Sequence, residues 1–259
     1  MTQDKDLLKN RFAANFRTYN ALAVVQEDIC RELAGIMARH ILAESVGRGF
    51  EFGAGTGFLT RRLLELYPCA AWTVNDLAEE SRPFIEKYAA GKDVDYLWGD
   101  AENAALPSCI DLAASASTMQ WFDDIPRFIV GMGGKINQGG YLAVTSFGPE
   151  NFREIKAVTG EGLEYYDIKE LREMFTGAGF ETVESNEYTK RLLFETPRDV
   201  LRHIKATGVN SIRPVRWNKR RLAEFEESYY RNFPVATDAG TQVSLTYHPV
   251  IILAQKQKA

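Results

Sequence analysis

The ten residues FEFGAGTGFL, positions 50–59, decide the fold of this chain. An apolar run that contains one acid, Glu51, leads into three glycines that alternate with small residues, at Gly53, Gly55 and Gly57. The run predicts a short strand, and the glycines predict a tight turn whose backbone comes close to a ligand. The amphipathic segment that follows predicts a helix, so the stretch indicates a strand, a ligand-binding turn and a helix in succession.

The alternation of strand and helix continues on both sides of this turn. Residues 46–148 repeat it several times, which predicts an α/β fold with a mostly parallel sheet and helices on both faces. Upstream, residues 7–43 carry apolar side chains at intervals of three and four and predict one amphipathic helix. Downstream, residues 181–194 predict one long edge strand, and residues 242–257 predict a C-terminal return to strand. A charged helical stretch at about 197–235 lies between these late strands.

The bulk composition indicates an ordinary globular protein. The chain has 259 residues, 45% of them hydrophobic, and a net charge of -4, which does not favour a nucleic-acid binder. Three cysteines without CxxC spacing and three widely separated histidines predict neither disulfides nor a metal site. The charged N-terminal residues do not predict a signal peptide, and no apolar run is long enough to predict a membrane span. We therefore expect a cytoplasmic protein, and we expect a monomer.

Acidic residues end the predicted strands and indicate which ligand the turn takes. Asp76 ends the second strand, where its carboxylate can accept hydrogen bonds from both hydroxyls of a ribose, which makes it a better candidate than Asn75. Asp100 ends the third strand, where it can accept a hydrogen bond from an adenine amino group. Glu51 would repel a pyrophosphate but suits a cationic amino group, and Phe58 stands where a dinucleotide fingerprint needs its third glycine. The turn therefore favours an adenosine ligand with an amino-acid end over NAD.

These requirements describe S-adenosylmethionine (SAM). The glycine turn, with an acid two residues before it and acids ending the next two strands, resembles the motifs of class I SAM-dependent methyltransferases over roughly residues 45–150. The resemblance implies a Rossmann-like fold with a seven-stranded sheet, SAM as the methyl donor and S-adenosylhomocysteine (SAH) as the product. It also implies the following cofactor-binding residues: Glu51, Gly53, Ala54, Gly55, Gly57, Asp76, Leu77, Asp100, Ala101 and Ser117.

Three further stretches narrow the resemblance to one family. They are RFAANFRTYNALAVVQ at 11–26, STMQWFDD at 117–124 and LRHIKATGVNSIRP at 201–214. All three resemble the malonyl-acyl-carrier-protein O-methyltransferases of biotin synthesis, and with them the resemblance covers nearly the whole chain. It implies a single domain, residues 1–259. Its expected parts are a helical cap at 1–45, a SAM-binding core at 46–148, and the rest of the sheet with a substrate lid, at about 197–235, within 149–259.

The family activity implies transfer of a methyl group from SAM to the free carboxylate of a malonyl group carried on acyl carrier protein. A carboxylate is already ionised near neutral pH, so the reaction requires no general base. Tyr19 and Trp121 are the catalytic candidates, because they can close over the methyl donor and wall the pocket. Arg213 can bind a carboxylate oxygen as a charge-assisted partner. The candidate substrate-binding residues are Tyr19, Gln26, Lys205, Asn210 and Arg213.

The stretch 198–221 carries an excess of basic residues with Asp199 as its one acid. Acyl carrier proteins in such systems are acidic, so this stretch predicts a docking surface on the lid. A solvated helix face is the alternative reading of any charge run. Trp217 is the one aromatic residue in the stretch, which disfavours nucleic acid. The predicted docking residues are Arg198, Arg202, Lys205, Arg216, Lys219, Arg220 and Arg221.

Two other functions fit the same motifs. The chain could act on another small-molecule or lipid-like substrate with the same SAM-binding core, because a shared fold does not fix a substrate. It could also bind SAM as a non-catalytic partner protein, since the cofactor motifs say nothing about the substrate half.

Overall fold

The main layer of the protein is a seven-stranded sheet with the strand order β3-β2-β1-β4-β5-β10-β6. The structure is a computed structural model that describes residues 4–207, 218–238 and 240–258. The first five strands in this order run parallel, and β10 is antiparallel to both of its neighbours. The strands are β1 Arg48–Phe52, β2 Ala71–Asp76, β3 Val94–Trp98, β4 Ile110–Ser115, β5 Ile136–Phe147, β6 Phe180–Glu187 and β10 Pro249–Lys256. The predicted seven-stranded, mostly parallel α/β sheet is thus confirmed.

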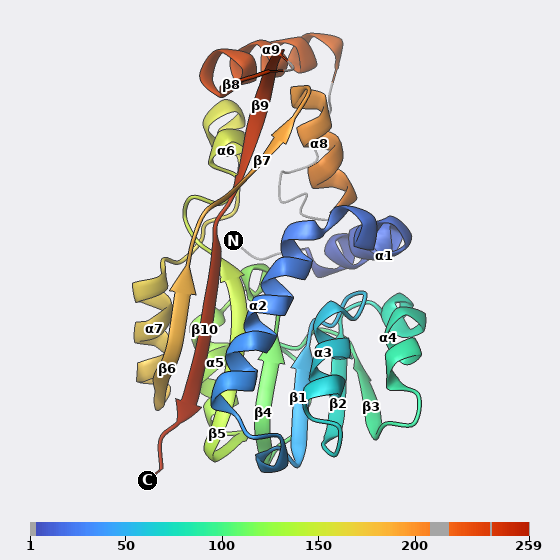
Figure 1. Ribbon diagram of the computed structural model, residues 1–259, viewed down its shortest axis with the longest axis vertical. Helices are drawn as coiled ribbons and strands as arrows, with labels where there is room; N and C mark the ends of the chain where they lie inside the picture. Colours follow the sequence, from blue (N-terminus) through green and yellow to red (C-terminus); the bar gives the residue numbers. More distant parts are fainter. Residues whose placement is uncertain (1–3, 208–217, 239, 259) are drawn as a thin grey trace.

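Helices cover both faces of this sheet, as Figure 1 shows. On one face α2, α3 and α4 pack against the core around Trp72, and on the other α5 and α7 pack around Phe52 and Phe180. The central strands β1 and β4 are nearly all buried, as expected for strands covered on both faces of a sheet. The helices are α2 Val24–His40, α3 Phe58–Leu66, α4 Arg82–Ala89, α5 Ile125–Gly133, α6 Arg153–Thr159 and α7 Ile168–Gly177, with short 3-10 turns η1 Ala43–Ser45, η2 Glu79–Ser81 and η3 Met119–Trp121.

A second, smaller sheet lies beyond one end of the main sheet (Figure 1). It has the strand order β7-β9-β8, and helices pack on it around a third apolar core that includes Tyr229 and Tyr247. The sequence did not predict this sheet. The elements are β7 Lys190–Phe194, α8 Pro197–Ala206, α9 Lys219–Asn232, β8 Pro234–Thr237 and β9 Gly240–Tyr247. The predicted helical insertion between late strands is therefore confirmed, and it forms part of this second layer.

Two predicted strands are each divided between the two sheets. Residues 181–194 do not form one edge strand, because β6 ends at Glu187 and β7 begins at Lys190 in the smaller sheet. Likewise β9 ends at Tyr247 and β10 begins at Pro249. An unbroken alternation of extended residues does not show where a chain leaves one sheet for another, because both halves bury apolar side chains equally well.

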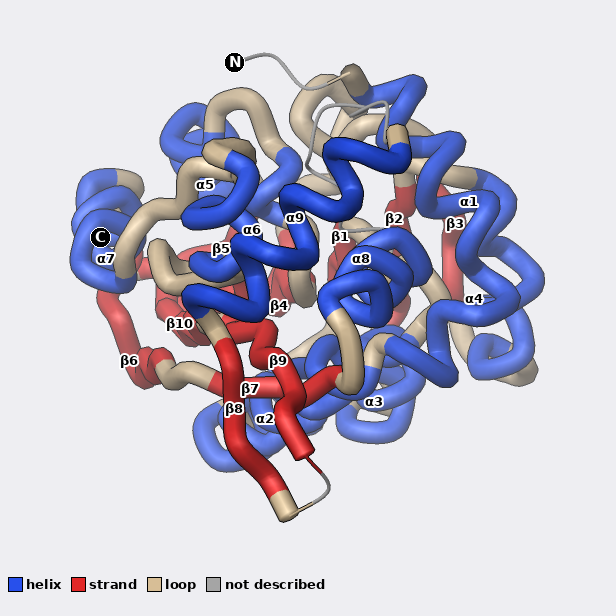
Figure 2. The backbone as a smooth tube through the Cα atoms, turned by 90° about the horizontal axis from the view of Figure 1, so that it is seen from above, coloured by secondary structure: helices blue, strands red, loops and turns tan. Residues whose placement is uncertain are grey.

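The prediction of one continuous helix over residues 7–43 is also wrong. The structure has α1, Lys5–Leu22, and then α2, with Ala23 outside helical geometry between them. Helix α2 packs on the main sheet, whereas α1 lies across the carboxyl ends of its strands and contacts α8. Seen from above in Figure 2, α1, α8 and α9 cover this end of the sheet. Within the described ranges, no helix combines the length and the apolar character needed to cross a bilayer.

Candidate active site

The glycine turn after β1 has the backbone geometry that its sequence predicts. Gly53, Gly55 and Gly57 all have positive φ, at 72°, 54° and 82°. A β-carbon at Gly53 would lie 2.1 Å from the Thr118 hydroxyl oxygen, so this position excludes a side chain. Gly55 has open space where its β-carbon would be, which leaves the backbone free to face a ligand. The turn is held in place because the backbone N–H groups of Gly53 and Ala54 donate to the carbonyl of Asn75.

Asp76 lies beside this turn at the end of β2. Its carboxylate accepts hydrogen bonds from the backbone N–H groups of Gly55, at 2.7 Å, and of Ala78, at 2.8 Å. Burial raises the pKa of Asp76 to about 6, and the two backbone donors offset part of that rise. The side-chain amide of Asn75 is instead occupied, since it donates to the carbonyls of Leu97 and Gly99. Asp76 is thus the side chain left to accept hydrogen bonds from a ribose.

The opposite end of the cavity is closed by Asp100 and its neighbours. The carboxylate of Asp100 caps its own turn by accepting from the Glu102 N–H and the Asn103 amide. Lys5 of α1 reaches this point, where its ammonium group donates to Glu102 at 2.7 Å and to the carbonyl of Trp121 at 2.9 Å. It also lies 3.7 Å from Asp100. This end therefore offers acidic and backbone groups to an adenine, and Lys5 ties α1 to it.

Helix α1 forms the roof of the cavity. Five side chains, spaced three or four residues apart, line the cavity from one face of the helix. Three aromatic contacts seat the roof: Phe12 packs edge-on against Trp121, Phe16 against Phe84, and Tyr19 against Phe58. Of these five residues only Tyr19 was predicted as a site residue, although the spacing of all five is visible in the sequence. The roof residues are Lys5, Leu8, Phe12, Phe16 and Tyr19.

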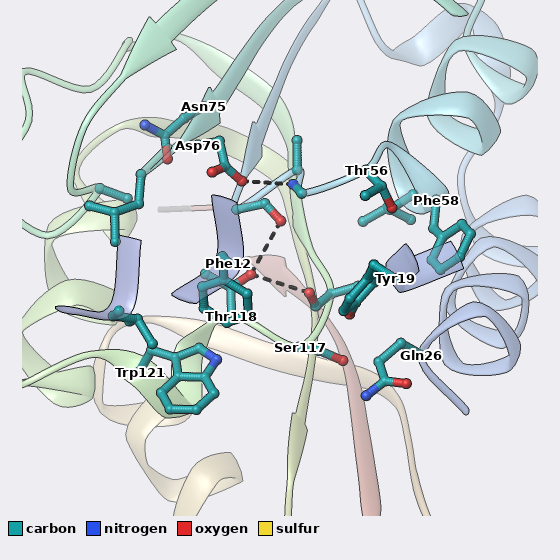
Figure 3. Close-up of a pocket in the computed structure, with 18 of the residues that line it drawn as sticks. Phe12, Tyr19, Gln26, Thr56, Phe58, Asn75, Asp76, Ser117, Thr118 and Trp121 are labelled. Atoms are coloured by element: carbon teal, nitrogen blue, oxygen red, sulfur yellow. Dashed lines mark hydrogen bonds between the residues drawn. The ribbon is translucent and has the colours of Figure 1, made fainter. Parts of the chain in front are cut away.

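Figure 3 shows Tyr19, Gln26 and Ser117 on one side of the cavity and Trp121 on another. Burial raises the pKa of the Tyr19 phenol, so Tyr19 keeps its proton at neutral pH. Ser117 has a φ of 55°, unusual for a residue other than glycine, and its backbone N–H is fixed by the carbonyl and hydroxyl oxygens of Thr145. Its own hydroxyl oxygen is buried and has no hydrogen-bond partner among the described residues. This side of the cavity therefore presents uncharged polar groups.

Glu51 lies behind the glycine turn and does not itself line the cavity. It is 1% exposed, and neither carboxylate oxygen has a hydrogen-bond partner of good geometry within the described part of the chain. Burial raises the pKa of Glu51 to about 8. Thr60 lies beside it and lowers its pKa in part, although the hydroxyl oxygen of Thr60 makes no hydrogen bond of good geometry within the described chain. A cation close to this acid would favour its ionised form, and a ligand can supply one.

The described cavity wall has a simple distribution of charge. Lys5 is its one cationic side chain among the residues that the structure describes, and it is already paired with Glu102. Asp76 and Asp100 are acidic, and Glu51 adds a third acid behind the turn. The cavity thus suits a ligand with positive charge and hydroxyl groups. Nothing in the described ranges forms a cluster of three or more metal-ligating side chains.

The cavity brings together most of the residues predicted from sequence. Ala54, Leu77, Ala101, Gln26 and Trp121 line it together with the glycine turn, the two aspartates, Ser117 and Tyr19. Gly57, the N-cap residue of α3, does not line it. Lys205 is exposed on α8 and is not part of the cavity wall either. Asn210, Arg213 and Arg216 lie outside the described residues. Thr118, Cys30 and Phe58 also line the cavity and were not predicted as site residues.

Three comparisons with known proteins bear on this site. A family model for a methyltransferase domain matches residues 50–144. A malonyl-acyl-carrier-protein O-methyltransferase of Chlorobium phaeovibrioides is 37% identical, over 99% of this chain and 98% of its own length. A protein of the same name from Bacteroides thetaiotaomicron is 36% identical, over 98% of this chain and 99% of its own. In fold, the chain resembles a methyltransferase from Bacillus halodurans with a TM-score of 0.64 at 18% identity, covering 88% of this chain and all of that one.

The comparisons and the cavity agree on the cofactor. The open backbone at Gly55, the acceptor at Asp76 and the unpartnered acid at Glu51 fit the ribose and the amino-acid end of SAM. The methyl donor is SAM, as family and fold imply. Both named relatives align beyond the SAM-binding core, through the roof helix and the insertion. The chain therefore belongs to the family of malonyl-acyl-carrier-protein O-methyltransferases.

Proposed function

We propose that this enzyme transfers the methyl group of SAM to the free carboxylate of a malonyl group on acyl carrier protein. The product is the malonyl methyl ester, which starts pimeloyl synthesis for biotin. The observation that carries the proposal is the similarity to relatives of that name over the whole chain, including α1 and the insertion. The core alone would support only a methyltransferase.

The reaction requires the protein to position the two reactants, and it requires no general base. When bound, SAM supplies a methyl group on a positively charged sulfur, and a neutral thioether remains after transfer. The malonyl carboxylate is already ionised, so its oxygen attacks the methyl carbon without losing a proton. Holding the two reactants in line is worth about 7–11 kcal/mol in well-oriented systems. We assign this role to Tyr19 of the roof and to Trp121, which both line the cavity.

Recognition of the malonyl carboxylate is proposed to use uncharged donors within the described part of the cavity. The hydroxyl of Tyr19 and the indole N–H of Trp121 have no hydrogen-bond partner among the described residues. Neutral donors orient a carboxylate while leaving more of its charge on the attacking oxygen than an arginine would. Arg213 stays a sequence-based candidate for selecting the carboxylate, outside the described residues.

The carrier protein is proposed to dock on the insertion. The ion pairs within the insertion indicate which of its basic residues are available to the carrier protein. Three of the seven predicted basic residues are paired with acids of the insertion itself: Arg198 with Glu226, Arg202 with Asp199, and Arg220 with Glu224. Of the predicted residues that the structure describes, the exposed ones with no such pair are Lys205, Lys219 and Arg221. These three are free to meet an acidic partner.

The test of the activity is a methyl-transfer assay with labelled SAM and three acceptors. Label on malonyl-carrier protein and none on acetyl-carrier protein is the expected result, because the acetyl group has no carboxylate. Malonyl-CoA tests whether the carrier itself is required. If no malonyl acceptor takes label while SAH still binds in a calorimeter, the substrate is another molecule or the chain is a binding partner.

The test of the docking surface is charge reversal. The triple change of Lys205, Lys219 and Arg221 to Glu is expected to raise KM for malonyl-carrier protein strongly and to leave KM for malonyl-CoA nearly unchanged. The matched control is Lys92→Glu, an exposed and unpaired lysine before β3, at the opposite end of the strands. Equal effects on both acceptors would place docking elsewhere. We also propose a single-domain monomer in the cytoplasm, which sedimentation and cell fractionation test.

A further inference from the structure

Helix α1 buries far less of itself than its neighbour α2. Of the 18 residues of α1 two, Leu8 and Phe16, are buried, whereas α2 buries eight of its 17. The two helices meet at Ala23, whose backbone leaves helical geometry with φ -84° and ψ 45°. A segment with few buried contacts opens at a lower free energy than the core, and a residue between two helices can act as a hinge. Helix α1 can therefore swing about Ala23 while α2 stays on the sheet.

Contacts along the length of α1 close the roof over the cavity. Phe12, Phe16 and Tyr19 each pack against an aromatic ring below the helix. Those rings belong to η3, α4 and α3, so three separate elements meet the roof. Figure 2 shows α1 across this end of the sheet. SAM in the cavity would thus lie beneath α1, and its exchange requires the roof to open.

Lys5 makes the polar contact at the free end of the roof. At 1.5 Å per residue it lies about 27 Å along the helix from Ala23, so it moves furthest when the helix swings. Its ammonium group donates to Glu102 at 2.7 Å and to the carbonyl of Trp121 at 2.9 Å. The side chains of Lys5 and Glu102 are 20% and 10% exposed, so water and salt screen this ion pair less than a pair on the open surface.

The floor of the cavity holds Glu102 in place for this contact. Its carboxylate accepts hydrogen bonds from the backbone N–H groups of Asp123 and Asp124, both at 2.9 Å. Both donors lie between η3 and α5, so the carboxylate is oriented by groups that do not belong to α1. The ion pair joins two protein groups, and it therefore stabilises the closed roof whether or not SAM lies beneath.

We propose that α1 is a lid over the cofactor and that Glu102 is its latch: the ion pair with Lys5 sets how fast SAM enters and SAH leaves. Glu102 is thus a positioning residue, which acts through Lys5 on the exchange of the cofactor and not on its affinity. The inference depends on SAM alone, so it stands or falls independently of the methyl acceptor.

The experiment follows SAH exchange on the full-length protein by stopped-flow tryptophan fluorescence, with Trp121 in the cavity wall as the reporter. Lys5→Met and Glu102→Gln each break the ion pair, and glutamine keeps an acceptor for the two backbone N–H groups. Each change is expected to speed both association and dissociation roughly tenfold, the lower end for a hydrogen bond between charged groups. Kd should change less than about twofold, because the closed roof is destabilised equally with and without SAH.

The matched control is Lys9→Met, one helical turn further along α1. Lys9 has no ion pair with the residues that the structure describes and does not line the cavity. Lys5→Met combined with Glu102→Gln should exchange SAH no faster than either change alone, since both remove the same pair.

Three results overturn the latch itself: unchanged dissociation of SAH in Lys5→Met, an equal effect of Lys9→Met, or single effects that multiply in the double variant. A rise in Kd by the same factor as the dissociation rate also overturns it, because Lys5 would then bind the ligand directly. Melting temperatures of the variants report whether the fold has been loosened; a gain in exchange rate that follows the loss of melting temperature in all variants, Lys9→Met included, refutes a specific role for the pair.

Discussion

Binding of SAH is expected to expel a proton from Glu51 at neutral pH. In the free protein this side chain is 1% exposed, and its carboxylate oxygens make no hydrogen bond of good geometry within the described chain. Burial raises its pKa to about 8, against a smaller opposing effect of Thr60. About nine molecules in ten therefore carry the proton at pH 7. The ligand brings an ammonium group toward the glycine turn, and a nearby cation favours the ionised carboxylate. Each bound ligand should then release about 0.9 proton from this residue.

Calorimetry in buffers of different ionisation enthalpy measures that number directly. The difference between the native chain and Glu51→Gln isolates the glutamate, because protonation of the ligand contributes equally to both. The same linkage makes SAH bind about fivefold more tightly at pH 8 than at pH 7 in the native chain, relative to the variant. Asp76, with its pKa raised to about 6, is already ionised over this range. Equal proton release from the two proteins would refute the idea that Glu51 senses the ammonium group.

The remaining predictions concern single side chains of the same cavity. Because the folded-state pKa of Glu51 is raised from 4.5 to about 8, its stabilising contribution is present below pH 4.5 and lost as the pH rises through 8. At pH 9 the ligand-free Glu51→Gln variant should therefore melt at a higher temperature than the native chain, and its free energy of unfolding should be higher by at most about 5 kcal/mol. Near pH 4.5 the two proteins should melt at the same temperature. Asp76→Asn is expected to weaken SAH about ten- to hundredfold in calorimetry, since it removes charged acceptors for the ribose; unchanged affinity would exclude that contact. Tyr19→Phe should lower kcat/KM for the malonyl acceptor about tenfold and leave the affinity for SAH unchanged. If only the affinity for SAH fell, Tyr19 would be a cofactor-binding residue instead. Gly53→Ala should lower the melting temperature more than Gly91→Ala, because both have a φ of 72° but only Gly53 faces a side chain at 2.1 Å; equal losses would show that the clash is relieved.

The cofactor end of this site was predictable because its signals are local. A tight turn that needs positive φ selects glycine, so Gly53, Gly55 and Gly57 are visible in sequence as a pattern. Acids that end adjacent parallel strands must meet at one edge of the sheet, which places Asp76 and Asp100 without any knowledge of packing. The choice between Asn75 and Asp76 could be argued only from chemistry, and the amide contacts of Asn75 support it.

The roof and the second sheet were less predictable because they depend on distant partners. The apolar side chains of α1 at intervals of three and four indicate a helix, but not that its buried face covers a cavity. Nor does the sequence show that the helix breaks at Ala23, a residue of high helix propensity. The passage from β6 to β7 depends on which strand each half pairs with, and β9 and β10 supply those partners from far along the chain.

The charge of the described cavity fits a reaction that consumes charge. A sulfonium and a carboxylate neutralise each other during the proposed transfer, so a site that strongly stabilised either separate ion would raise the barrier. Asp76 lies in the wall and Glu51 lies behind it, and both acids favour binding of the cationic donor, whereas the one described cation of the wall, Lys5, is paired at the adenine end. Around Tyr19, Ser117 and Trp121 the available groups are uncharged, so a carboxylate placed there would keep its nucleophilic charge. Replacing Ser117 by Lys tests this balance: a cation at that point should bind the malonyl acceptor more tightly but lower kcat. A rise in kcat would mean that the carboxylate needs a positive partner, and that the functional arginine or lysine lies outside the described wall.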